Sequence, residues 1–138
     1  MNEDDFGVWS VRFSGDGREI VAGTSNNSVY VYDIETQKVL HEVDAHEDDV
    51  NAVCFADATS SHVFYSGSDD GLIKVWDRRS LKGNTSVGGF VGHTEGITFV
   101  DTKGDGRYCL SNSKDQVILT FNDFLMTLNE QFSFHLSP

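Results

Sequence analysis

Short runs in which apolar and polar residues alternate occupy most of the chain. In residues 9–13 every second residue is apolar, which is the period of a half-buried β-strand. Runs such as 53–55 and 63–65 are rich in β-branched and aromatic residues, and Asp-Gly pairs that favour tight turns separate several of these runs. No segment of helical length repeats its apolar positions every 3.6 residues. The pattern predicts an all-β chain with strands at 7–13, 18–23, 28–33, 38–43, 50–55, 62–67, 72–77, 86–91, 97–101, 107–111 and 116–121.

An internal repeat organises these strands. The segments 29–33, 73–77 and 118–122 end alike, and Tyr32 lies 44 residues before Trp76, which lies 45 residues before Phe121. A period near 45 residues is typical of the four-stranded blades of a β-propeller. We therefore predict a partial propeller of about three four-stranded antiparallel blades whose ring is not closed. The repeats divide the chain into a degenerate first repeat (1–45), a well-formed second repeat (46–91), an incomplete third repeat (92–123) and an atypical tail (124–138).

Four residues of the second repeat have the spacing of an internal hydrogen-bond chain. We expect the Asp70 carboxylate to bind His46, the histidine to bind the Ser66 hydroxyl, and that hydroxyl to meet the Trp76 indole N–H. Each buried polar group would then have a partner, and an unpaired one costs roughly 1–3 kcal/mol. This hydrogen-bond chain should act as a structural staple for its blade.

The same spacing recurs in the third repeat and weakens in the first. The third set is His93, Ser111, Asp115 and Phe121, in which the indole donor is missing; the first is Asp4, Ala22, Asn26 and Tyr32. A catalytic Ser-His-Asp site would not recur in each blade, and no strand-turn-helix nucleophile elbow is present. The sequence therefore predicts no enzyme and no catalytic residue, and it disfavours a hydrolytic propeller.

Charge limits the partners of the chain. Acidic residues outnumber basic residues by 22 to 10, and the formal net charge at pH 7 is −12. Such a surface repels phosphate backbones and anionic lipid headgroups. We expect neither nucleic acid nor membrane among the partners.

Targeting and cofactor signals are also lacking in the sequence. Residues 1–5 contain no basic segment, and no apolar run approaches the roughly 18 residues of a membrane span. We therefore expect a cytoplasmic and/or nuclear protein with two buried, inert thiols, Cys54 and Cys109. The histidines lack metal-ligand spacing, and residues 101–106 imitate only the start of a calcium loop. We expect no cofactor and no metal.

Several motifs resemble the WD-repeat family. They are the stretch 66–71 (Ser-Gly-Ser-Asp-Asp-Gly), the stretch 75–77 (Val-Trp-Asp) and the pair Gly92-His93. The resemblance covers about residues 6–121. Within the family, three stretches are similar to substrate receptors of cullin-4 RING ubiquitin ligases: 46–57, 74–79, and 92–99 continued by 111–116. That resemblance implies a protein-interaction module with two partners, the propeller adaptor of the ligase and an unknown protein substrate.

One motif carries the implied docking function. Trp76-Asp77-Arg78-Arg79 matches the W-D-x-R box with which such receptors bind the adaptor, so the resemblance assigns adaptor binding to Asp77, Arg78 and Arg79. A planar guanidinium with five donors suits an acidic or carbonyl-lined pocket. The alternatives are a solvated loop arginine in a WD-repeat scaffold of another pathway, and an inert truncated product.

The end of the chain departs from the family pattern. Phe121-Asn122 stands where a third Trp-Asp pair is expected, and the tail 124–138 matches nothing in the family. Residues 125–128 and 132–134 alternate enough to form an outer strand, or they form an exposed apolar tail. Three blades cannot close a ring, so we expect a truncated form that associates with other copies through its open blade edges.

Overall fold

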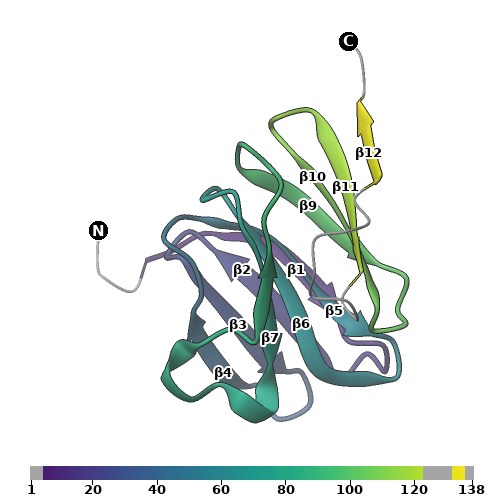
Figure 1. The fold of residues 1–138 in the computed structure, drawn as a ribbon. Coiled ribbons are helices and arrows are strands. Elements are labelled where there is room, and N and C mark those ends of the chain that lie inside the picture. Colours follow the sequence, from purple (N-terminus) through teal and green to yellow (C-terminus); the bar gives the residue numbers. More distant parts are fainter. Residues whose placement is uncertain (1–4, 123–131, 136–138) are drawn as a thin grey trace.

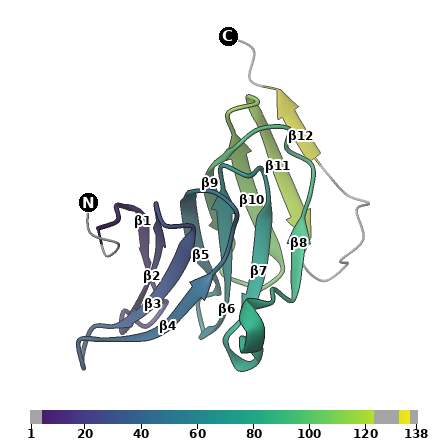
Figure 2. The same ribbon diagram turned by 90° about the vertical axis from the view of Figure 1, so that its left-hand side faces the viewer.

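The computed structural model describes residues 5–122 and 132–135 of the 138-residue chain. In these residues twelve strands form three separate four-stranded antiparallel sheets, which lie side by side (Figures 1 and 2). Blade 1 contains β1 (Val8–Phe13), β2 (Glu19–Thr24), β3 (Ser28–Asp33) and β4 (Lys38–Asp44). Blade 2 contains β5 (Val50–Asp57), β6 (Ser60–Ser68), β7 (Ile73–Asp77) and β8 (Gly88–Phe90). Blade 3 contains β9 (Ile97–Thr102), β10 (Tyr108–Ser113), β11 (Val117–Asn122) and β12 (Phe132–His135).

This arrangement confirms the predicted all-β chain and the open, partial propeller. Each of the eleven predicted strands overlaps an observed one. Two short 3-10 turns, η1 (Arg78–Ser80) and η2 (Lys82–Asn84), were not predicted, and they connect β7 to β8. Gly17, Gly71 and Gly106 have φ values of 73°, 84° and 72°, so the Asp-Gly pairs form left-handed turns as the sequence indicates.

The tail supplies the outer strand of blade 3. β12 pairs with β11 in antiparallel register, with Ile118 opposite Phe134 and Thr120 opposite Phe132. Of the two readings that the sequence left open, the outer strand is therefore correct for residues 132–135. Residues 125–128 lie outside the described part of the chain.

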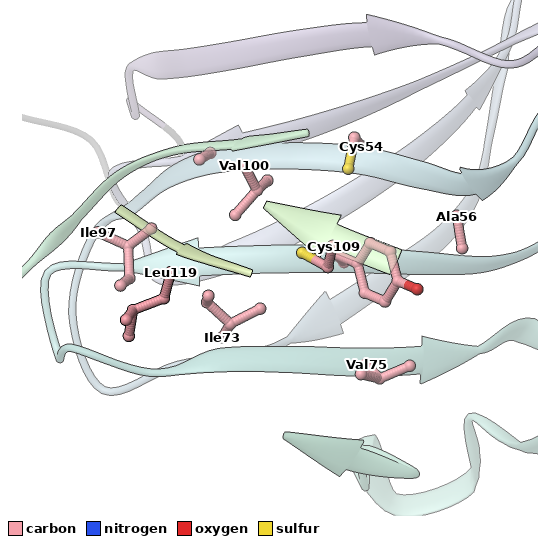
Figure 3. Close-up of a cluster of buried hydrophobic side chains, with 10 residues drawn as sticks. Cys54, Ala56, Ile73, Val75, Ile97, Val100, Cys109 and Leu119 are labelled. Carbon is pink, nitrogen blue, oxygen red and sulfur yellow. The ribbon is translucent and has the colours of Figure 1, made fainter. Parts of the chain in front are cut away.

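Blade 2 is buried on both faces because blade 1 covers one face and blade 3 covers the other. Successive residues of its strands point to these two faces in turn. Val53, Phe55, Phe64 and Trp76 pack with the buried valines of blade 1, which are Val21, Val29, Val31 and Val43. The residues that alternate with them face blade 3, where Cys54, Tyr65, Ile73 and Val75 pack with Ile97, Val100, Cys109 and Leu119 (Figure 3). Burial raises the pKa of the Cys54 thiol to about 12, so this cysteine stays protonated at neutral pH.

A hydrogen-bond chain crosses the interior of blade 2. Trp76 Nε1 donates to Ser66 Oγ over 2.8 Å, Ser66 Oγ lies 2.7 Å from His46 Nε2, and His46 Nδ1 lies 2.9 Å from Asp70 Oδ2. An indole N–H can only donate and a carboxylate can only accept. Burial lowers the pKa of His46, so its ring is neutral at pH 7. The one ring proton lies on Nδ1, toward the Asp70 carboxylate, and Nε2 accepts from the Ser66 hydroxyl.

Asp70 also ties two loops to this chain. Its carboxylate accepts from the backbone N–H of Glu47 (3.3 Å) and of Leu72 (2.9 Å). The first donor belongs to the segment before β5 and the second to the turn between β6 and β7. Loss of this one side chain would leave three donors without their acceptor.

Blade 3 repeats most of the arrangement, and blade 1 does not. His93 Nδ1 lies 3.0 Å from Asp115 Oδ2, and His93 Nε2 lies 2.8 Å from Ser111 Oγ. Phe121, in β11, is a residue type without a polar donor. In blade 1, Asn26 takes the place of Asp70 and donates to Tyr30 Oη of its own blade over 3.2 Å.

The first and last blades expose apolar side chains. In β1, Trp9, Val11 and Phe13 are 56%, 58% and 69% exposed. Val11 lies opposite Ala22 in the β1–β2 ladder as Val53 lies opposite Ser66 in the β5–β6 ladder, and Val53 is only 1% exposed because blade 1 covers it. The exposed face of β1 therefore corresponds to the face of β5 that is buried against blade 1. In a longer propeller, another blade would cover the face of β1 in the same way.

Self-association is the first prediction of this geometry. We expect the purified chain to elute above its monomer mass of 15.3 kDa in size-exclusion chromatography with light scattering. The double variant Val11→Lys/Phe13→Lys should shift the chain toward monomer, whereas Val87→Lys, at an exposed position outside blade 1, should not. A well-dispersed wild-type monomer would contradict the prediction.

The Asp70 contacts predict unequal stabilities. Asp70→Ala should lower Tm more than Asn26→Ala, because it leaves the buried His46 N–H without an acceptor, at a cost of about 1–3 kcal/mol, and also removes the acceptor of two backbone N–H groups. Thermal unfolding followed by circular dichroism measures both. Equal shifts would refute the role of the hydrogen-bond chain as a staple.

Stability should also fall in mild acid. Burial lowers the pKa of His46, and Lys74 adds to this, while Asp70 opposes it without reversing it. Between the lowered pKa and about 6.5, the unfolded chain binds a proton that the folded chain does not, so the free energy of unfolding decreases as pH falls below about 6.5.

Urea unfolding at several pH values tests this dependence. His46→Gln should flatten the decrease. A His41→Gln variant is measured in parallel, because His41 could contribute to the same pH dependence: burial and then Arg78 lower its pKa as well. A His46→Gln variant with the wild-type pH dependence would rule out the proposed titration.

Candidate functional site

The turn that follows β7 contains the three residues of the predicted docking box. We call residues 77–80 the Asp77 turn. Asp77 ends β7 in extended conformation, and its side chain accepts from the Arg79 backbone N–H over 2.9 Å, which caps η1. Aspartate favours this capping position because its short carboxylate reaches the first unpaired N–H groups of a helical turn.

Arg79 extends from the Asp77 turn into solvent while it pairs with Asp77. Its Nε lies 2.9 Å from Asp77 Oδ1 and its Nη2 lies 2.8 Å from Oδ2, so the ion pair is two-pronged. The Arg79 side chain is 64% exposed. The hydrogen bonds from Arg79 lower the pKa of Asp77, which keeps the carboxylate charged at neutral pH. The pair uses two of the five guanidinium N–H groups.

Arg78 points into the molecule. Its Nη1 lies 2.5 Å from Glu19 Oε2 and its Nη2 lies 3.3 Å from Oε1, while Nη1 also donates to the backbone oxygen (3.2 Å) and hydroxyl (3.0 Å) of Ser61. The side chains of Arg78 and Glu19 are only 14% and 18% exposed. Arg78 therefore connects β7 to β2 of blade 1 and to β6.

These contacts separate the predicted box into two parts. Arg79 is exposed and pairs with Asp77, whose side chain is only 19% exposed, and Arg78 forms a partly buried tie between blades. Glu19 and Ser61 are contact residues that the sequence reasoning missed. Glu19 precedes Arg78 by 59 residues, and no motif or spacing in the chain links them.

A recess lies beside Arg79. It is bordered by His62 and Arg107 and by two aspartates, Asp57 and Asp105. Backbone hydrogen bonds from Thr59 and from Arg107 lower the pKa values of Asp57 and Asp105, respectively, so both are charged at neutral pH. The recess therefore presents both signs of charge next to the exposed guanidinium.

The residues of the two hydrogen-bond chains lie in the interior of their blades, away from the Asp77 turn and its recess. Ser66 and Ser111 are fully buried, and His46 and His93 are 5% and 9% exposed. Their geometry holds loops to strands and leaves the serine hydroxyls out of reach of a substrate. In residues 5–122 and 132–135, no group of three or more His, Cys, Asp or Glu side chains is placed to hold a metal ion. Nor does that part of the chain contain a helix with the length and hydropathy to cross a membrane.

Comparisons with known proteins agree with the fold. LEC14B protein from Lithospermum erythrorhizon is 55% identical over 125 residues, which is 90% of this chain and 26% of the relative. The DDB1- and CUL4-associated factor 11 homolog from Caenorhabditis briggsae is 53% identical over 114 residues, which is 80% of this chain and 20% of the relative. The chain thus spans about a fifth to a quarter of the length of these curated relatives.

A solved structure and a family model extend the comparison. A chain in the crystal structure of the mitotic checkpoint complex superposes with a TM-score of 0.79 at 27% identity, over 95% of this chain and 38% of that chain. Residues 1–117 match the family model described as Nucleolar protein 10-like, N-terminal domain, a β-propeller. The chain therefore belongs to this family of WD-repeat β-propeller domains.

Proposed function

We propose that the chain is part of a substrate receptor of a cullin-4 RING ubiquitin ligase and that Arg79 docks it on the propeller adaptor. The observation that carries the proposal is the exposed Arg79 guanidinium, held by Asp77 at the end of β7, at the position of the W-D-x-R box. The name of the Caenorhabditis briggsae relative associates that protein with DDB1 and CUL4. We take DDB1 as the adaptor for this chain.

The chemistry of the site supports docking through Arg79. The guanidinium stands beside a recess and keeps N–H groups beyond those that Asp77 uses. Asp77 fixes its plane, so little side-chain freedom is lost on binding. A buried arginine that fills a partner's pocket is a common hot spot in protein interfaces.

The proposed role is positional and not catalytic. The adaptor holds one rim of the propeller, and another surface presents an unknown protein substrate to the ligase. The burial of Ser66 and Ser111 supports a structural function for the serine-histidine-aspartate sets. We propose a nuclear or cytoplasmic location for this role, and the nucleolar name of the matching family favours the nucleus.

Mutation of Arg79 tests the proposal. Arg79→Ala should weaken DDB1 binding about 30-fold or more, which corresponds to the ~2 kcal/mol of a hot spot. Arg79→Lys should give an intermediate loss because an ammonium cannot form the planar fork. Biolayer interferometry with the immobilised chain measures both dissociation constants.

Lys82→Ala is the matched control, since it removes an exposed cation from the neighbouring η2. It should leave binding unchanged within about a factor of two. Wild-type affinity in Arg79→Ala, with an unaltered circular dichroism spectrum, would reject docking through Arg79. A wild-type chain that does not bind DDB1 would reject the ligase role and favour a scaffold of another pathway.

A further inference from the structure

We infer that Glu19 is a positioning residue for adaptor docking, so that the docking site depends on blade 1 as well as on blade 2. This inference rests on the proposed docking of Arg79. Glu19 acts through Arg78, the neighbour of Arg79 in the Asp77 turn. Its role is to fix the path of that turn, and it does not contact the adaptor.

Glu19 is a rigid support. It is the first residue of β2, where it is opposite Asp33 in the ladder with β3, and its backbone N–H donates to Ser14 Oγ over 3.1 Å. Its side chain is 18% exposed. A carboxylate held in this way gives Arg78 a fixed partner in the neighbouring blade.

Arg78 is held from two strands at once. Both carboxylate oxygens of Glu19 accept from it, at 2.5 and 3.3 Å, and Ser61 in β6 accepts through its hydroxyl and its backbone oxygen. Exposed ion pairs contribute little because water and salt screen them, but this pair is mostly removed from solvent. The four contacts anchor the middle of the Asp77 turn.

The anchor has a direct consequence for Arg79. The Asp77 cap holds the backbone of Arg79 from one side, and the Arg78 anchor holds the preceding peptide. Without Glu19 the cap and the Asp77–Arg79 pair remain, but the turn can rotate about β7. The guanidinium would then leave the orientation in which it meets the adaptor, since small displacements of a binding group reduce affinity.

A double-mutant cycle tests the inference with the whole chain and purified DDB1. Glu19→Gln keeps the shape of the side chain and removes its charge, and we expect about a five-fold weaker dissociation constant. In the Arg79→Lys background, Glu19→Gln should cause less than about a two-fold further change, because the fork that Glu19 orients is already lost. Glu35→Gln is the control: it removes a charge from an exposed position of the same blade and should leave binding unchanged.

A charge swap provides the rescue. Glu19→Arg combined with Arg78→Glu rebuilds the ion pair in reverse and should recover most of the affinity that Glu19→Arg alone removes. A purely structural role would change Tm without this coupling to Arg79. If Arg79→Ala weakens binding and Glu19→Gln does not, the positioning role is wrong and the docking proposal stands. If Arg79→Ala leaves binding intact, the docking proposal itself fails.

Discussion

The hydrogen-bond chain from Trp76 to Asp70 is the constraint on which the middle blade depends. It begins at an indole that is 1% exposed and stacked on Phe64 at 6.4 Å between ring centroids, and it ends at a carboxylate that also holds two loops. Each polar side chain in this path is hydrogen-bonded to the next, so the path crosses the interior without an unpaired polar group. Trp76 immediately precedes Asp77. The turn that presents Arg79 therefore starts from a residue fixed in the core.

The three blades do not depend on one another equally. Blade 2 has a packed neighbour on both sides, whereas among the residues that the structure describes the outer blades expose apolar side chains, such as Val11 in blade 1 and Phe99 in blade 3. One ion pair links these two blades directly, since Arg12 of β1 donates to Asp101 of β9 over 3.0 Å. The Arg78–Glu19 pair links blade 1 to blade 2. Charged contacts thus supplement the apolar packing where strands of different blades meet.

Much of this structure follows from local pattern and from the repeat. Alternation of apolar residues located the strands, and the recurring spacing of His46, Ser66, Asp70 and Trp76 anticipated which side chains meet. The outer strand β12 could not be decided, because two phenylalanines that alternate with polar residues suit both a strand and an exposed tail. The inward direction of Arg78 was also hidden, since its partner Glu19 lies in another blade and an arginine beside a second arginine in the sequence carries no sign of burial. Contacts between repeats are set by the packing angle of the blades, which a single sequence does not display.

An electron cryomicroscopy structure of the chain bound to DDB1 would test the central claim most directly. The Arg79 guanidinium should lie inside a pocket of the adaptor, with Arg78 still joined to Glu19 and turned away from the interface. An adaptor bound at the exposed face of β1, or an Arg79 side chain left in solvent, would contradict it.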